Sequence, residues 1–426
     1  MNQLIHQPTK PSRLESQLIE QLWELQPLRE QQLIELVEIN SSSLNPEGIN
    51  RTGEYLEALF TPLSDRCERI TLSPWERLDF DGRLLKQPLG DLWRYRCRTE
   101  APIQILLCGH LDTVFPKNSP FQCISRITPT CLNGPGAADM KGGILVILSA
   151  LSLLEKHPEH HKIGWTLLLN PDEEIGSPGS APLLQKEAVK HHIGLVYEPT
   201  LPDQNLAGAR KGSGNFTCAV HGRAAHAGRE PEKGRNAINK AAEILLDLAQ
   251  FNHLRPGLTL NTGMIQGGET TNKVPDLAVF KFNIRIAQPE DAQWCQQKLN
   301  HLIKAANQQD GYNVTLHGGF GRLPKQLDPV HLSLYQYLQQ CALHLGRKVH
   351  WQATGGCCDG NNLSAAGLPN IDTLGVHGNF IHSADEIIEL PSLTQQAQLS
   401  ALLLFKIAQQ GLPTGISQRE SREARR

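Results

Sequence analysis

The stretch IGWTLLLNPDEE (residues 163–174) is a mainly apolar run that ends in two adjacent glutamates. IQILLCGHLD (103–112) and HIGLVYEP (192–199) have the same form, with charged or other polar residues at the end of each run. Short apolar runs of this kind are typical of strands buried on both faces of a sheet. The three stretches therefore predict strands of a mostly parallel sheet.

Helices are predicted around these strands. KGGILVILSALSLLEKH (141–157) reads as a long apolar helix opened by glycines, and apolar strands that alternate with helices indicate a sheet covered on both faces. Ligands of such sheets bind beyond the carboxyl ends of the strands, where the polar residues of the three stretches fall. Residues 12–39 carry leucine and isoleucine at helical spacing interrupted by Pro27, which predicts two short helices.

The pattern changes between residues 208 and 320, where it reads strand, helix, strand, strand, helix, strand. VFKFNIRI (279–286) alternates apolar and polar residues, as a half-exposed strand does. A chain of 426 residues also exceeds the usual size of a single core. We therefore expect an α/β protein, with a larger domain formed by residues 1–207 and 320–426 and an inserted α/β sandwich of βαββαβ order at 208–319.

Composition narrows the class of partner. The 41 basic and 43 acidic residues give a net charge of -2, which provides no field for holding nucleic acid or an anionic membrane, so we expect a small-molecule or peptide partner. No apolar run approaches the roughly 20 residues of a membrane span, and the N-terminus lacks the features of a signal peptide. The ten cysteines are scattered, with no C-x-x-C pair. We therefore expect a soluble cytoplasmic protein with reduced, mostly buried cysteines.

Polar residues at the strand ends form a candidate metal-binding set. Two adjacent carboxylates repel each other unless a cation compensates them. Each residue taken singly has an ordinary explanation, such as a hydrogen-bonded histidine or a helix-capping aspartate, but together they give nitrogen and oxygen ligands that suit Zn²⁺, Co²⁺ or Mn²⁺. The set consists of His110, Asp112, Asp139, Glu173, Glu174, Glu198 and His382.

Five motifs then occur in a fixed order around the inserted segment. They are GHLDTV (109–114), GPGAADMKGG (134–143), PDEEIGS (171–177), YEP (197–199) and HSADE (382–386). This combination resembles the M20 metallopeptidases over about residues 29–410. Within that family it is most similar to the glutamate carboxypeptidase (carboxypeptidase G2-like) branch, with acetylornithine deacetylase and succinyl-diaminopimelate desuccinylase as cousins.

The resemblance implies two divalent metal ions, with zinc expected first. His110 and Glu198 would bind one ion, Glu174 and His382 the other, and Asp139 would bridge the two. Asp112 would orient the His110 ring, and Glu173 would be the general base that takes a proton from the metal-bridging water. Because successive strand residues point to opposite sides, one glutamate of the pair can face the metal and its neighbour the water.

The resemblance also implies roles in the inserted segment and in a later loop. His226 would reach into the active site of the partner in a homodimer and stabilise the oxyanion. Arg285 would bind a substrate carboxylate, for which a guanidinium fork is suited, although an exposed residue in an ion pair is the alternative. Asn272 and Gly356 would contact substrate. In the loop TGGCCDGNN (354–362), Cys357 and Cys358 stand where relatives commonly carry small or hydroxyl residues, and we interpret them as packing residues near a cleft.

Three functional hypotheses follow. The first is a metal-dependent hydrolase of an amide or peptide bond that releases a C-terminal or N-acylated amino acid, with an N-acyl amino acid deacetylase or desuccinylase as the alternative substrate class. The second is a non-catalytic metal-binding homologue, which would need a lost ligand or base, and none is missing. The third is a thiol enzyme, which would need a thiolate in an electropositive pocket, and no cysteine lies in such a motif.

Overall fold

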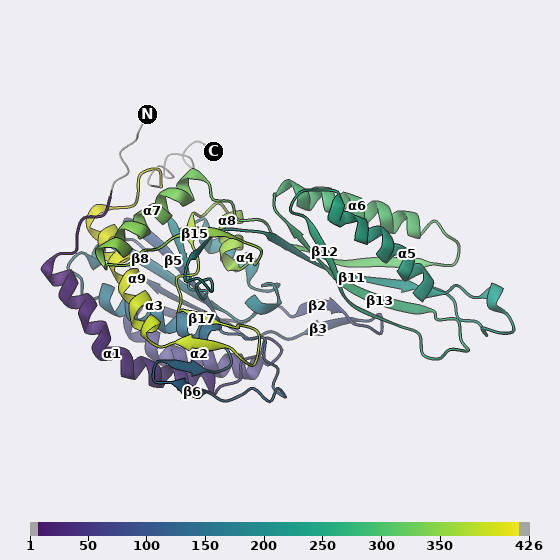
Figure 1. Ribbon diagram of the computed structural model, residues 1–426, viewed down its shortest axis with the longest axis horizontal. Helices are drawn as coiled ribbons and strands as arrows, with labels where there is room; N and C mark the ends of the chain where they lie inside the picture. Colours follow the sequence, from purple (N-terminus) through teal and green to yellow (C-terminus); the bar gives the residue numbers. More distant parts are fainter. Residues whose placement is uncertain (1–6, 417–426) are drawn as a thin grey trace.

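The larger of two structural units is built on a six-stranded sheet (Figure 1). The computed structural model describes residues 7–416. The strand order is β1-β4-β8-β5-β9-β16, in which β5, β8, β9 and β16 are parallel and β4 and β1 continue the sheet antiparallel. The strands are β1 (Arg66–Ile70), β4 (Leu92–Cys97), β5 (Ile103–His110), β8 (Ile163–Asn170), β9 (Ile193–Val196) and β16 (Asn370–Ile371). The expected mostly parallel sheet is confirmed.

Helices bury both faces of this sheet. Ile105 and Leu107 of β5 pack into the core shared with α1, α2, α3, α7 and α9, whereas Leu106 and Cys108 pack toward α4 and α8. Because neighbouring residues of one strand are buried on opposite faces, the strand reads as a continuous apolar run. The helices are α1 (Arg13–Val37), α2 (Pro46–Phe60), α3 (Gly143–Leu154), α4 (Ala181–Ala188), α7 (Pro329–His344), α8 (Asp359–Ala365) and α9 (Pro391–Gln410).

The two short helices expected over residues 12–39 are one helix, α1, with Pro27 inside it. Proline removes one helical hydrogen bond, but Pro27 is exposed to solvent, and the opposite side of α1 buries Leu22, Leu33 and Leu36 in the core. That burial holds the helix together across the proline.

The segment Ala137–Leu154 is long and apolar enough to be a membrane span by composition, but 94% of it is buried inside the fold, as in the core helix of a globular protein.

The smaller unit has a four-stranded antiparallel sheet of order β12-β13-β11-β14. Two helices cover one face, and their apolar residues share a core with Phe216, Phe280 and Phe282. Along the chain the order is βαββαβ, as expected. The elements are β11 (Gly212–His221), α5 (Ala237–Ala249), β12 (Thr259–Gly267), β13 (Leu277–Ile286), α6 (Glu290–Ala306) and β14 (Asn313–Arg322).

A hairpin of the larger unit covers the other face of the small sheet. It consists of β2 (Trp75–Leu78) and β3 (Leu84–Gln87), and Figure 1 shows it reaching from the larger unit to the small sheet. Leu78 and Phe80 pack against Ala219, Leu277 and Val279. The sequence patterns did not predict this hairpin, which fastens the two units together.

Two small sheets position loops near the carboxyl edge of the main sheet. In one, β10 (Leu206–Arg210) pairs in parallel with β15 (Trp351–Thr354), which leads into the loop of residues 355–358. The other has the order β17-β18-β7-β6 and holds the loop that carries His382. Its strands are β6 (Ser125–Thr128), β7 (Cys131–Asn133), β17 (Gly378–Asn379) and β18 (Ile387–Glu389).

Candidate metal centre

The carboxylate of Asp139 lies between two histidines. Its Oδ1 is 3.2 Å from Nε2 of His110, and its Oδ2 is 3.2 Å from Nε2 of His382. His110 ends β5, Asp139 lies in the turn before α3, and His382 lies in the loop between β17 and β18. One carboxylate therefore offers an oxygen to each histidine, as a bridging ligand would.

Two more carboxylates complete the cluster. Oε2 of Glu174 is 3.1 Å from Nε2 of His382, and Oε2 of Glu198 is 3.8 Å from Nε2 of His110. Glu174 follows β8 and Glu198 follows β9, so both come from carboxyl ends of parallel strands. The structure brings together all five side chains that the family resemblance implies as metal ligands.

The electrostatics of the cluster fit a cation. Burial and the neighbouring Asp139 raise the pKa of Glu174 to about 7, and hydrogen bonds to Asp139 and Glu174 raise the pKa of His382 to about 11. Burial also raises the pKa of Glu198, although His110 lowers it. Oε1 of Glu174 is buried without a hydrogen-bond partner among residues 7–416. Divalent ions would compensate the crowded carboxylates and provide a partner for that oxygen.

Asp112 supports the cluster in two ways. Its backbone carbonyl accepts a hydrogen bond from Nδ1 of His110 at 2.9 Å, which leaves Nε2 directed at Asp139. Its carboxylate accepts the backbone N–H groups of Glu173 and Glu174, both at 3.1 Å, and the hydroxyl of Ser43 at 2.7 Å. One aspartate thus orients the histidine and holds the turn that carries both glutamates.

Glu173 points to a different neighbour from Glu174. Its Oε1 is 2.9 Å from Nη2 of Arg322, while one of its carboxylate oxygens lies within 4.8 Å of ligand atoms of His110 and Glu198. Burial raises the pKa of Glu173 well above its usual range, although the Arg322 guanidinium opposes this shift. The two adjacent glutamates therefore have separate environments.

Sequence patterns missed two supporting residues. Arg322 belongs to none of the motifs that point to the site. Glu386 is the last residue of the motif HSADE, but that motif drew attention only to its histidine. Its carboxylate accepts the backbone N–H groups of Gly136, Ala138 and Asp139 at 2.9 to 3.1 Å, so it holds the turn that positions Asp139.

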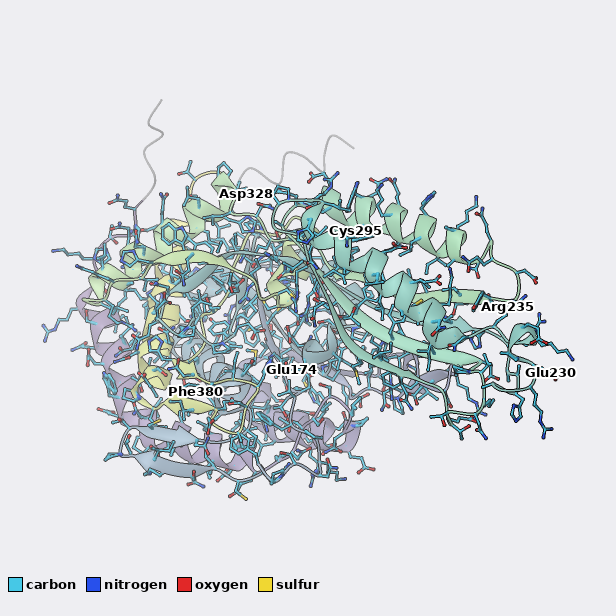
Figure 2. The ribbon with its side chains drawn as sticks, turned by 45° about the vertical axis from the view of Figure 1, so that its right-hand side comes forward. Glu174, Glu230, Arg235, Cys295, Asp328 and Phe380 are labelled. Atoms are coloured by element: carbon cyan, nitrogen blue, oxygen red, sulfur yellow. The ribbon has the colours of Figure 1, made fainter. Side chains whose placement is uncertain are left out.

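A single chain does not bring His226 or Asn272 to the cluster. His226 is in the loop after β11, where its Nδ1 accepts the N–H of Gly228. Its carbonyl accepts the N–H of Glu230, and Figure 2 shows Glu230 at the end of the small unit farthest from Glu174. The carbonyl of Asn272 accepts the N–H of Ala227 in the same region.

Arg285 and Gly356 lie where the two units meet. The Nε of Arg285 donates to Oδ1 of Asn283 at 2.9 Å, and its Nη1 is 2.9 Å from Sγ of Cys357, the residue after Gly356. Within residues 7–416 Arg285 has no carboxylate partner, so the alternative of an exposed ion pair is wrong. The interpretation of both cysteines as packing residues holds for Cys358, which is buried in the core.

For Cys357 that interpretation is wrong. Its Sγ is 2.9 Å from Nη1 of Arg285 and 3.8 Å from Nη1 of Arg322, so a cysteine does lie in an electropositive setting. The two arginines stand 72 and 35 residues away along the chain, which is why no local motif revealed this environment.

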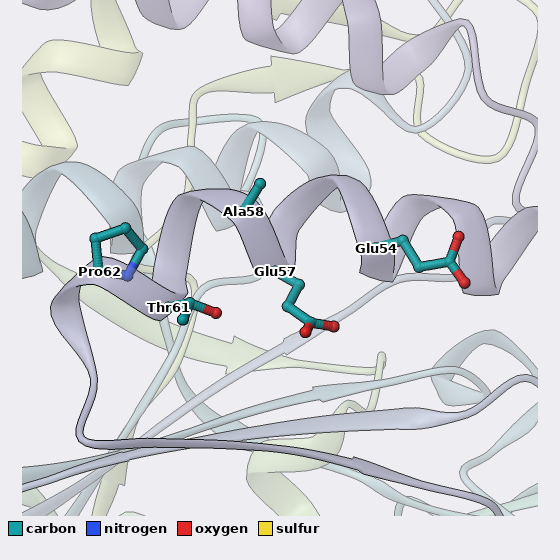
Figure 3. A pocket seen from close by; sticks show the side chains of 5 residues that line it. All are labelled: Glu54, Glu57, Ala58, Thr61 and Pro62. Atoms are coloured by element: carbon teal, nitrogen blue, oxygen red, sulfur yellow. The ribbon is translucent and has the colours of Figure 1, made fainter.

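A surface hollow of about 530 Å³ on α2 offers no comparable site. Figure 3 shows its lining, Glu54, Glu57, Ala58, Thr61 and Pro62. Both carboxylates are already engaged, Glu54 with Arg69 at 2.9 Å and Glu57 with the indole N–H of Trp93 at 3.0 Å. The cluster around Asp139 therefore remains the candidate active site.

Known proteins resemble this chain over most of its length. Residues 208–311 match the family model of the M20 peptidase dimerisation domain. Carboxypeptidase G2 from Pseudomonas sp. (strain RS-16) is 27% identical over 90% of each chain, and succinyl-diaminopimelate desuccinylase from Nitrosospira multiformis is 26% identical over 81% of this chain and 95% of its own. The M20 family metallo-carboxypeptidase Sso-CP2 from Sulfolobus solfataricus has the same fold, with a TM-score of 0.67, 17% identity, and coverage of 89% of this chain and 99% of its own. The chain belongs to the M20 family of metallopeptidases and is a hydrolase of that family.

Proposed function

We propose that this enzyme cleaves an amide or peptide bond and releases a C-terminal or N-acylated amino acid, as a glutamate carboxypeptidase does. The observation that carries the proposal is the carboxylate of Asp139, which is shared between His110 and His382 with Glu173 close by and separately held. A shared carboxylate supports a two-metal site, and a neighbouring carboxylate outside the ligand set supports acid–base chemistry.

The proposed cofactors are two divalent metal ions, zinc first, with cobalt or manganese as alternatives. His110 and Glu198 would hold one ion, Glu174 and His382 would hold the other, and Asp139 would be shared between them. When bound, the ions polarise the carbonyl of the scissile bond and acidify a water molecule.

Glu173 is the proposed general base. It takes a proton from the attacking water on a carboxylate oxygen and then donates that proton to the leaving amine. Arg322 holds Oε1 of Glu173 at 2.9 Å, and Asp112 holds its backbone N–H at 3.1 Å, so the base is oriented at both ends. These contacts of Arg322 and Asp112 support a role for the Glu173 carboxylate in proton transfer and not in metal binding.

The active enzyme is proposed to be a homodimer. β12 is one of the two edge strands of the small sheet and is mostly exposed, with Met264 and Ile265 more than half exposed. Pairing of two such edges would satisfy their free backbone groups. His226 of one chain would then stabilise the oxyanion in the partner's site, and Asn272 would contact the substrate there.

Arg285, with Gly356 beside it, is proposed to bind a carboxylate of the substrate, because the guanidinium has no carboxylate partner among the described residues.

The proposed location is the cytoplasm. In support of it, all ten cysteines, which lie within residues 7–416, are free thiols.

The two relatives differ in substrate, so we keep two substrate classes. The first is the carboxypeptidase class, favoured by the 90% coverage of carboxypeptidase G2. The alternative is an N-acyl amino acid deacetylase of the acetylornithine deacetylase or succinyl-diaminopimelate desuccinylase type. A non-catalytic homologue is disfavoured, because every ligand and the base are present.

A hydrolysis screen separates these classes. The metal-loaded protein is given one series of substrates that release glutamate while the acyl side varies from acetyl to bulky aromatic or peptidyl groups, and a second series in which acetyl or succinyl groups are carried by basic amino acids. Preference for large acyl groups supports a carboxypeptidase. Strict preference for acetyl, with basic amino acids favoured over glutamate, supports the deacetylase, and no hydrolysis of any member refutes both.

A further inference from the structure

Cys357 lies in a cationic corner between the two units, formed by Arg210, Arg285 and Arg322 around the loop of residues 355–358. Arg285 comes from β13 and Arg322 from β14, and an Nη1 of each is within hydrogen-bonding reach of Sγ. Cys357 is a partly exposed residue, and Gly355 and Gly356 before it are exposed, so the thiol lies beside an open stretch of loop.

The charges of the corner leave one guanidinium without a counter-ion. Arg322 pairs with Glu173 at 2.9 Å and lies 3.5 Å from Asp359, whereas the acceptors of Arg285 within residues 7–416 are Oδ1 of Asn283 and Sγ of Cys357. The thiol is therefore the nearest group that can supply the missing negative charge. Burial acts against the thiolate, but Arg322 and Arg285 lower the pKa of Cys357 below its usual value.

Arg210 adds to the positive charge of this corner. Its side chain is only 8% exposed, and its Nε and Nη2 donate to Asp372 at 2.9 and 3.0 Å. Its Nη1 donates to no residue in the described part of the chain, and it lies 3.6 Å from the point where a Cβ on Gly356 would stand. Arg210 therefore adds a third guanidinium beside the exposed Gly356.

The adjacent Cys358 has the opposite environment. It is 2% exposed, its Sγ accepts the N–H of Gly360, and burial raises the pKa of its thiol well above the usual value. A thiol in that state is inert. Of the two neighbouring cysteines, Cys357 alone has the setting of a reactive thiol.

We propose that Cys357 is a peroxide-reactive thiol and that its oxidation closes the carboxylate subsite of Arg285. The sulfur of the thiolate attacks hydrogen peroxide, so that an S–O bond forms and the O–O bond breaks, and the hydroxide that leaves takes the proton of the new sulfenic acid and becomes water. The resulting sulfenate keeps its negative charge between Arg285 and Arg322 and competes with a substrate carboxylate. A small thiol condenses with the protonated sulfenic acid and releases water, and a second thiol reduces the mixed disulfide and restores Cys357.

The reactivity of the Cys357 thiol is argued from its position beside Arg285 and Arg322. Closure of the subsite also rests on the proposed function, in which Arg285 binds a substrate carboxylate. The first experiment therefore needs no activity. Full-length, metal-loaded protein is treated with limiting hydrogen peroxide, sulfenic acid is trapped with dimedone, and the labelled peptides are quantified by mass spectrometry. Cys123, which is exposed, is the internal reference. We expect Cys357 to label about tenfold faster than Cys123 and Cys358 to stay unlabelled.

Variants on strand β13 link the labelling to charge. Arg285→Gln should bring the labelling rate of Cys357 close to that of Cys123, whereas Arg285→Lys should keep most of it. Lys281→Gln is the matched control, because it removes a positive charge from the same strand where the side chain lies over Phe80. Equal labelling of Cys357 and Cys123 in the native protein overturns the reactive thiol.

The second experiment measures hydrolytic activity before peroxide treatment, after it, and after reduction with dithiothreitol. The activity of each protein is expressed as a fraction of its own untreated rate. The native enzyme should lose most of its activity reversibly, Cys357→Ser should lose little, and free glutamate should slow the labelling of Cys357. Selective labelling without loss of rate overturns the closure of the subsite. A protein that labels selectively but hydrolyses no substrate refutes the proposed function and leaves the reactive thiol standing.

Discussion

The guanidinium of Arg322 holds Glu173 twice, with Nη2 2.9 Å from the carboxylate Oε1 and 2.9 Å from the backbone carbonyl of the same residue. Both side chains are buried. Arg322 ends the last strand of the small unit, whereas Glu173 follows a central strand of the large unit. The orientation of the proposed base therefore depends on how the small unit sits against the large one.

Glu173→Gln should lose nearly all turnover and still bind two metal ions. A general base typically contributes about 10²- to 10⁴-fold to the rate, and the substitution keeps the size of the side chain. Metal content and turnover are measured on the same preparation, with Glu174→Gln as the control that should lose metal. If Glu173→Gln loses metal but regains turnover when metal is restored, the roles of the two glutamates are reversed.

Arg322→Met should destabilise the protein and shift its pH profile. Removing one partner of a buried ion pair costs about 3 to 5 kcal/mol of unfolding free energy. Because Arg322 lowers the pKa of Glu173, its loss raises that pKa, and the base becomes protonated at a higher pH. The acidic limb of kcat/KM should therefore move to higher pH. An unchanged limb, at normal metal content, would show that Arg322 does not act on the base.

The metal-free protein should take up two zinc ions per chain. His382→Ala should reduce the uptake to one tightly bound ion, and Asp139→Asn should weaken both, because its carboxylate contacts both histidines. Binding to the folded state alone raises the melting temperature as metal is added. Calorimetric titration gives the stoichiometry, and an uptake of one ion by the native protein would rule out the two-metal site.

Arg285→Ala should lower kcat/KM by roughly 10- to 150-fold for substrates with a free carboxylate, since a hydrogen bond to a charged group is worth about 1.5 to 3 kcal/mol. Amidated or esterified substrates should lose much less. Lys281→Ala on the same strand serves as the control and should leave both substrate types unaffected. An equal loss for free and amidated substrates would mean that Arg285 supports the fold instead of binding substrate.

Mixing two inactive variants tests the role of His226 across the dimer. A Glu173→Gln chain still carries His226, and a His226→Ala chain still carries Glu173, so each mixed dimer contains one complete site if His226 acts on its partner. Random exchange should restore about a quarter of the native activity. No recovery, with mixed dimers verified by native mass spectrometry, would place His226 outside the partner's site.

The order of elements and the convergence of strand ends were predictable from sequence, because both follow from local periodicity. His110 ends a buried strand, Glu174 and Glu198 follow two others within a few residues, and parallel strands bring their carboxyl ends to one edge. Pro27 misled the prediction of α1, since local sequence does not show that the opposite side of the helix is buried in the core.

Residues that act through distant partners were not predictable. Nothing beside Arg322 in the sequence signals its contact with Glu173, which lies 149 residues earlier. Cys357 and Cys358 are chemically identical neighbours in the chain, and only the tertiary fold gives one of them two guanidinium groups and buries the other in the apolar core.

The β2–β3 hairpin has a consequence for anyone who cuts the protein into parts. Residues 208–319 are continuous in the chain, but the surface that closes them is not, because Leu78 and Phe80 come from the larger unit. An excised fragment would expose Ala219, Leu277 and Val279 to water and would be prone to self-association. Grafting residues 75–87 onto it, or replacing Leu277 and Val279 by polar residues, would be the way to obtain a soluble autonomous module.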